Sequence, residues 1–134
     1  MGPNEKILRK GYADYANGNL ESLMTLFADD VVMKSVGAPS RLDHAGEWHG
    51  LDGVRGFLAA ILANWTFQKI EMLEMIVKDD TRFVVRTAVT GKSLRVGGRV
   101  ASVERVDLVT MKNGKCTSYA EIFDTSPLER ASRL

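Results

Sequence analysis

The segment that most constrains this fold is the last third of the chain, where two β-rich runs flank Asn113-Gly114. Asn-Gly between two such runs is the strongest short-range signal for a β-hairpin, because both residues tolerate the positive φ angles of a tight turn. If these two residues are the central turn residues, counting outward places Val106 opposite Glu121. The sequence therefore predicts the register of this hairpin, and with it the residues on each face.

Side chains alternate between the two faces of a strand. One face of the predicted hairpin is mostly apolar and carries two glutamates, its members being Ser102, Glu104, Val106, Leu108, Thr110, Thr117, Tyr119, Glu121 and Phe123. The other face carries Val103, Arg105, Asp107, Val109, Met111, Cys116, Ser118, Ala120 and Ile122. An apolar wall with a few polar groups is typical of a small-molecule pocket. We therefore expect the first face to line a cavity; the alternative is that it is the solvated face of an antiparallel sheet.

Two carboxylates on this face are the catalytic candidates. In the predicted register, Glu104 and Glu121 are diagonal neighbours, about 7–8 Å apart at the backbone. Burial in an apolar cavity and repulsion between the two would both raise the pKa of Glu121. A carboxyl group with a raised pKa suits general acid–base catalysis. The alternative is that Glu121 forms a salt bridge with Arg82 or Arg86.

The composition of the chain excludes several classes of protein. The chain has 134 residues, 45% of them hydrophobic and 26% charged, which suits one soluble domain spanning residues 1–134. A net charge of +1 favours neither nucleic acid nor an acidic membrane surface. The single cysteine, Cys116, excludes an internal disulfide, and the two histidines form no recognisable metal motif. We expect no metal, no cofactor and no membrane span, and a cytoplasmic location, since the first residues do not resemble a signal peptide.

Periodicity earlier in the chain predicts helices followed by strands. Apolar residues recur at helical spacing after Asn4, again from Leu20 to Phe27, and again in residues 54–62. Short strands are expected at residues 31–36, 65–77 and 82–90, and a long loop at residues 37–50. Helices first and strands later indicate an α+β domain, with three helices packed in the concavity of a strongly curved antiparallel sheet. The tail after Asp124 is at most a short helix.

Several large side chains outside the hairpin are predicted to be core or cavity wall. The expected ligand-binding residues are Met33, Trp48, Phe57, Trp65, Val106, Leu108, Tyr119 and Phe123. Tyr15 of the first helix is a candidate hydrogen-bond donor into the cavity, so it joins Glu121 and Glu104 as a catalytic candidate. His44 either lines the mouth of the cavity or is solvated in its loop, and His49 is interpreted as structural.

Three stretches in this order resemble the SnoaL-like branch of the NTF2-like superfamily, which includes ketosteroid isomerases and limonene epoxide hydrolase. They are NGNLESLMTLFADDVVM, HAGEWHGLDGVRGFLAAI and VDLVTMKNGKCTSYAEIFDTS. The resemblance covers nearly the whole chain. It implies a conical half-barrel in which a curved sheet wraps around a long first helix and encloses an apolar cavity. It also implies a homodimer through the outer face of the sheet.

The resemblance implies catalytic roles only residue by residue. Two acidic positions of ketosteroid isomerases fall on Ser35 and Val106, so steroid isomerisation by that mechanism is not expected. Limonene epoxide hydrolase uses an Arg-x-Asp pair and an Asp on its last strand, and Glu121 stands where that Asp does. Arg105 and Asp107 form a local Arg-x-Asp, but the predicted register puts this pair on the outward face and on a different strand.

Two functions remain open at this stage. The first is an enzyme that acts on a small, mostly apolar molecule by acid–base chemistry, as an isomerase, a cyclase or an epoxide hydrolase. The second is a non-catalytic ligand-binding or dimerisation domain. In either case the outer sheet face, expected to carry Arg105, Asp107, Val109, Met111 and Ile122, is the candidate dimer interface.

Overall fold

The computed structural model describes residues 1–133, the side chain of Gln68 excepted. The elements in chain order are α1 (Pro3–Ala16), α2 (Leu20–Met24), β1 (Phe27–Ser35), β2 (Gly46–His49), α3 (Gly50–Asn64), β3 (Trp65–Lys78), β4 (Arg82–Ser93), β5 (Val100–Lys112), β6 (Lys115–Ile122) and α4 (Ser126–Ala131). The predicted α+β class is confirmed. The helix count differs, because the tail forms the short helix α4 in addition to the three expected helices.

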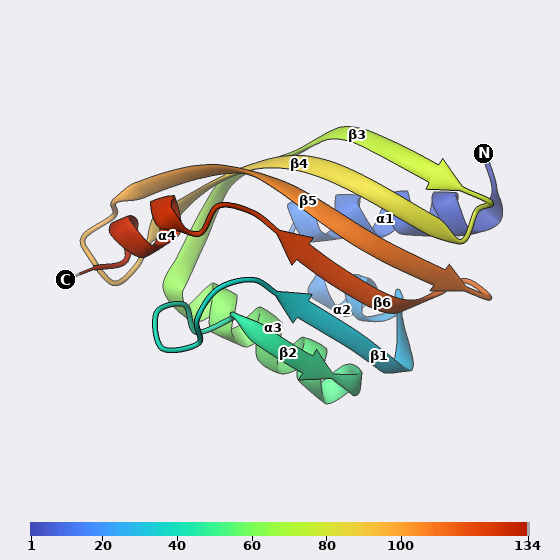
Figure 1. The fold of residues 1–134 in the computed structure, drawn as a ribbon, viewed down its shortest axis with the longest axis horizontal. Helices are drawn as coiled ribbons and strands as arrows, with labels where there is room; N and C mark the ends of the chain where they lie inside the picture. Colours follow the sequence, from blue (N-terminus) through green and yellow to red (C-terminus); the bar gives the residue numbers. More distant parts are fainter. Residues whose placement is uncertain (134) are drawn as a thin grey trace.

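The six strands form one sheet in the order β2-β1-β6-β5-β4-β3. Every neighbouring pair is antiparallel except β1 and β6, which run parallel. Figure 1 shows β3, β4 and β5 arching over α1, while β1 and β2 turn downward and lie against α3. The concave side of this bent sheet therefore faces the helices, and the interior of the half-barrel lies between them.

The start of α1 is fixed by a residue far away in the sequence. Asn4 is not the cap that its sequence position suggests, because Gly2 occupies that place. Instead, Asp80 in the β3–β4 turn accepts hydrogen bonds from the backbone N–H groups of Asn4 (3.0 Å) and Glu5 (2.9 Å). The Asn4 side chain in turn accepts a hydrogen bond from the N–H of Gly114 (2.9 Å). A carboxylate at a helix N-terminus satisfies free N–H groups and complements the helix dipole, so these contacts hold α1 against two hairpin turns.

The predicted second helix is too long. The structure ends α2 at Met24 and begins β1 at Phe27, so Asp29 and Asp30 lie within a strand. The reason is tertiary: the N–H of Cys116 in β6 donates to the carbonyl of Leu26 (2.7 Å), and Phe27 pairs with Cys116. Pairing with a distant strand thus overrides the local helical pattern.

The β5–β6 hairpin turns at Asn113-Gly114 as predicted, but its register differs from the simple count. Met111 still pairs with Cys116, whereas Thr110 pairs with Ser118, so one extra residue of β6 is accommodated in a bulge. Because side chains alternate with a period of two, a slip of one residue turns every later side chain of β5 to the other face relative to β6. The inner face therefore combines Arg105, Asp107, Val109 and Met111 of β5 with Tyr119 and Glu121 of β6.

Because of this slip, three of the predicted site residues were assigned to the wrong face of the sheet. Glu104, Val106 and Leu108 do not face the cavity but lie on the outer side of the sheet. Glu104 forms an ion pair there with Arg86, and Leu108 is 44% exposed. The physical reason is burial: the slip turns Val109 and Met111 into the core, where both are almost fully buried.

Candidate active site

Three charged side chains meet inside the half-barrel. Arg105 and Asp107 are two residues apart on β5 and so share its inner face, and Glu121 on β6 is the register partner of Asp107. Arg105 is 8% exposed, Asp107 0% and Glu121 3%. Charged side chains are almost never this deeply buried unless they are paired, so the three form one electrostatic unit.

The Arg105 guanidinium bridges the two carboxylates. Its Nη2 donates a hydrogen bond to Asp107 Oδ2 at 3.1 Å, and its Nη1 lies 3.4 Å from Glu121 Oε2. Burial by itself lowers the pKa of Arg105, but the negative potential of Tyr119, Asp107 and Glu121 outweighs it and holds that pKa well above its ordinary value. Arg105 is therefore a permanent positive charge between two acids.

Hydroxyl groups from three elements complete the cluster. The Tyr12 hydroxyl of α1 donates to Asp107 Oδ2 at 2.6 Å. The Ser35 hydroxyl of β1 donates to Glu121 Oε1 at 2.6 Å, and the Tyr119 hydroxyl donates to Glu121 Oε2 at 3.2 Å. Short hydroxyl–carboxylate hydrogen bonds of this kind are strong and fix both acids in place.

The pKa of Glu121 is raised above its ordinary value. Burial is the largest cause, and the Asp107 carboxylate adds to it. Arg105 and the hydrogen bonds from Ser35 and Tyr119 act in the opposite direction without cancelling the effect. Glu121 thus keeps a proton to a higher pH than a solvated glutamate does.

Two apolar chambers open on either side of this cluster. Measured as the space open to the centre of a water molecule, the first has a volume of about 50 Å³ and is lined mainly by α1, α2, α3 and the inner sheet face. The second has about 40 Å³ and lies toward α4 and the end of α3. Tyr15, Arg105 and Glu121 line both chambers. A molecule in either chamber therefore contacts Arg105 and Glu121, whereas Asp107 lines neither chamber.

Most of the sequence-predicted site residues lie around these chambers. Those that line one or both are Tyr15, Met33, Phe57, Trp65, Tyr119, Glu121 and Phe123. Glu104, Val106 and Leu108 lie outside, as described above. Tyr15 contributes its ring, its hydroxyl makes no hydrogen bond to another described residue, and burial raises the pKa of that hydroxyl.

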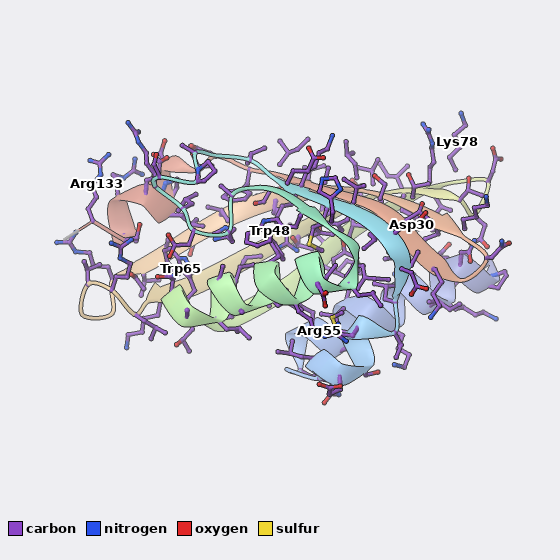
Figure 2. All side chains as sticks on the ribbon, turned by 90° about the horizontal axis from the view of Figure 1, so that it is seen from below. Asp30, Trp48, Arg55, Trp65, Lys78 and Arg133 are labelled. Carbon is purple, nitrogen blue, oxygen red and sulfur yellow. The ribbon has the colours of Figure 1, made fainter. Side chains whose placement is uncertain are left out.

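Trp48 lines neither chamber and packs against the core, which is the other of the two positions predicted for it. Figure 2 shows it beside α3, while Trp65 lies where that helix ends. Its indole N–H donates to the backbone carbonyl of His44 at 3.0 Å. A Cβ atom at position 56 would lie 2.9 Å from the Trp48 ring, so Gly56 is what lets the ring pack against the helix. Trp48, which lies in β2, thus holds the loop of residues 37–45 against α3.

The two histidines differ sharply. His44 is buried and lines the second chamber, so the solvated alternative for it is wrong. Burial first, and then repulsion from Arg105, lowers the pKa of His44 to about 4, against a smaller opposite effect of Asp43. His44 is therefore a neutral ring at pH 7. His49, by contrast, is exposed next to α3, with its Nε2 atom 2.9 Å from Glu47 Oε1.

The residues that the sequence analysis missed as site residues are Arg105 and Asp107. They were assigned to the outward face because the simple hairpin count overlooked the bulge between Thr110 and Met111. One signal pointed the other way: Arg105 and Asp107 share their face with Val109 and Met111, and that face is too apolar to meet solvent. Reading it as the inner face would have found the cluster.

Within residues 1–133, no group of three or more His, Cys, Asp or Glu side chains is arranged to hold a metal ion. No helix in the same range has the length and apolar character needed to cross a membrane.

Comparison with known proteins places the chain in a family. Residues 8–119 match the sequence profile of the SnoaL-like domain. The chain belongs to the SnoaL-like domain family. No curated protein matches the sequence of this SnoaL-like chain.

Solved structures share the whole fold of this SnoaL-like protein. An NTF2-like protein of unknown function from Burkholderia pseudomallei K96243 has a TM-score of 0.87 at 23% identity, with 100% of each chain covered. An NTF2-like protein from Burkholderia thailandensis E264 has a TM-score of 0.85 at 15% identity, again with 100% of each chain covered. TerC, co-crystallized with polyporic acid, has a TM-score of 0.80 at 23% identity, with 98% of each chain covered. At these identities the similarity shows the NTF2-like fold and nothing finer.

Proposed function

We propose that this SnoaL-like protein is an acid–base catalyst that acts on a small, mostly apolar molecule, and that addition of water to an epoxide is the reaction its site fits best. The observation that carries this proposal is the buried Arg105 guanidinium between the carboxylates of Asp107 and Glu121. A charged cluster of this kind, set in otherwise apolar chambers, is typical of catalytic sites.

The choice among isomerase, cyclase and epoxide hydrolase rests on which residues surround Glu121. Limonene epoxide hydrolase, which the sequence resembles, combines an Arg-x-Asp pair with an acid on the last strand. Here Arg105 and Asp107 supply such a pair on the inner face, on a different strand from that of the hydrolase. Glu121 lies on β6, the last strand in chain order, with its Oε2 atom 3.4 Å from Arg105 Nη1. These three residues support epoxide hydrolysis over steroid isomerisation. In ketosteroid isomerases the catalytic base is an aspartate, and Ser35 stands at that position here.

The two acids have complementary roles in this mechanism. Glu121, whose pKa is raised, carries the proton that it donates to the epoxide oxygen as the carbon–oxygen bond breaks. Asp107, which accepts hydrogen bonds from Tyr12 and Arg105, takes a proton from water as the water oxygen bonds to the epoxide carbon. The product is a diol, and proton transfer from Asp107 to Glu121 through solvent restores the starting state. Arg105 stabilises the charge on Asp107 before that proton transfer and the charge on Glu121 after Glu121 has donated its proton.

A non-catalytic ligand-binding domain is the second candidate. The observation that favours it is that the hydroxyls of Tyr12, Ser35 and Tyr119 already bond to the two carboxylates. Hydrogen bonds of this kind also serve to rigidify an apolar binding cavity. TerC, whose structure was obtained with polyporic acid, supports a small organic molecule as the occupant.

The test uses styrene oxide as a probe and measures its diol product by chromatography at pH 7. We expect the wild-type protein to form the diol faster than buffer, and Asp107→Asn to lower the rate by about 10²-fold or more. The matched control is Asp30→Asn, which changes an exposed aspartate on β1 and should leave the rate unchanged. Binding of styrene oxide without diol formation would favour the non-catalytic candidate. The absence of both binding and turnover would contradict the proposal.

We also propose that the protein forms a homodimer through the outer face of its sheet. Of the five residues first expected at this interface, Ile122 lies on the outer face, whereas the other four face the interior, namely Arg105, Asp107, Val109 and Met111. Exposed apolar side chains on the outer face come from β3, β4, β5 and β6, namely Ile76, Val84, Leu108 and Ile122. A contiguous apolar patch of this kind is typical of a protein–protein interface.

Sedimentation velocity at micromolar concentration tests the dimer. The wild-type protein should sediment at about twice its 14.8 kDa chain mass. Leu108→Glu should give a monomer, because it buries an unpaired charge in the interface. Leu94→Glu changes an equally exposed leucine beyond the end of β4 and should leave the dimer intact. A wild-type chain that remains monomeric as its concentration rises would rule the interface out.

A further inference from the structure

Three buried polar atoms near the site have no hydrogen-bond partner among the described residues. They are Thr87 Oγ1, Arg105 Nε and Asp107 Oδ1. Thr87 is 0% exposed, so bulk solvent does not reach its hydroxyl directly. Buried polar atoms without partners are rare and costly, and each one calls for a partner that protein atoms do not supply.

These three atoms belong to neighbouring positions on one face of the sheet. Thr87 of β4 pairs directly with Arg105 of β5, and Asp107 pairs with Val85, two residues from Thr87 on the same face. Arg105 Nε lies 2.9 Å from Asp107 Oδ1, yet its N–H is not aimed at that oxygen, so the two make an ionic contact and not a hydrogen bond. The three atoms thus belong to neighbouring positions of the inner face, and they offer one donor, Arg105 Nε, and two acceptors.

A hollow between α1 and the strands β3 and β4 reaches Thr87, and neither Arg105 nor Asp107 lines it. It has a volume of about 260 Å³ open to the centre of a water molecule, and its lining includes Tyr12, Ile70, Met72 and Thr87. Tyr12 also lines the first chamber and donates to Asp107, so it stands between the hollow and that chamber. A single water needs only about 10–15 Å³ of such space and two to four polar partners.

We infer that a water molecule is bound between Thr87 Oγ1, Arg105 Nε and Asp107 Oδ1, and that it exchanges with solvent through the hollow beside α1. The hydrogen bonds balance: Arg105 Nε–H donates to the water oxygen, and the water donates one hydrogen to Asp107 Oδ1 and the other to Thr87 Oγ1. All three unpartnered atoms are then satisfied by one molecule.

This water reaches Asp107 by a route separate from the two chambers that would hold a ligand. Asp107 can therefore exchange protons with solvent while both chambers are filled. This proton exchange rests on the proposed function, whereas the water site itself rests only on the unpartnered atoms and the hollow.

Thr87→Val tests the site by the sign of its effect on stability. Valine has the shape of threonine without the hydroxyl, and it suits a strand. If the hydroxyl holds a water, its loss leaves that water and its other partners poorly satisfied, and we expect the melting temperature to fall by about 3–8 °C. If the hydroxyl has no partner, removing it relieves a buried polar group. An unchanged or raised melting temperature would therefore overturn the inference.

The control is Thr90→Val on the same strand. Thr90 lies on the outer face, where its hydroxyl is 3.0 Å from Ser102 Oγ, and its replacement should change the melting temperature little.

A crystal structure of the wild-type protein is a second test of the water site. Ordered density within hydrogen-bond distance of Thr87, Arg105 and Asp107 is expected, and its absence would also overturn the inference. Both readings hold whether or not the protein turns over an epoxide.

Discussion

Replacing Arg105 by methionine is expected to lower the free energy of unfolding at pH 7 by about 3–5 kcal/mol, because it removes the cation that faces the buried Asp107 and Glu121 side chains. Asp107 and Glu121 are almost fully buried, so water cannot replace the lost partner. Methionine fills much of the space of the arginine stem, which keeps the loss of packing small. The loss is a large share of the 5–15 kcal/mol that typically stabilises a domain. Urea unfolding measures it.

The pH dependence of this loss separates electrostatics from packing. Arg105 lowers the pKa of Glu121, so its removal raises that pKa further above the ordinary value of 4.5. A raised folded-state pKa means that stability falls as pH rises through the unfolded value. The loss should therefore shrink as pH is lowered toward 4. Arg86→Met, which removes the exposed partner of Glu104, is the matched control and should have a much smaller effect. Equal losses in the two variants would contradict a central role for Arg105.

Replacing Glu121 by glutamine is expected to lower turnover of the styrene oxide probe by about 10²–10⁴-fold, because glutamine cannot donate the proton that the epoxide oxygen needs. Size and shape are preserved, so binding of the probe should survive. The wild-type rate should fall as pH rises through the folded-state pKa of Glu121, since the protonated acid is the active form. Glu104→Gln, on the outer face, should leave the rate unchanged.

The same variant tests the protonation state of Glu121 through stability. Because its folded-state pKa is raised, wild-type stability falls as pH rises above about 4.5, and glutamine removes that dependence. Glu121→Gln should thus be neutral or stabilising at pH 7 and indistinguishable from wild type in acid. A loss of about 2 kcal/mol or more at pH 7 would show instead an ionised carboxylate paired with Arg105. The general-acid role would then lose its physical basis.

Local sequence determined much of the fold. Asn113-Gly114 supports the positive φ values of a two-residue turn, and the turn forms there. Apolar spacing in residues 3–16 and 50–64 is enough to predict α1 and α3, because one stripe of each helix must be buried. Glu121 is buried as predicted, since its neighbour Tyr119 faces the same interior. Each of these features depends on residues close together in the chain.

Tertiary structure alone decided which side chains join Glu121. Near the turn, the sequence is compatible with two registers that differ by one residue, and each offers an apolar face. Burying Val109 and Met111 beneath the helices selects the register with the bulge, which carries Arg105 and Asp107 inside and leaves Glu104 with Arg86 outside. Because side chains along a strand alternate between its two faces, a slip of one residue exchanges the inner face for the outer one. The choice depends on the packing of helices far away in the sequence, and in the local sequence only the apolar character of the face with Val109 and Met111 points to it.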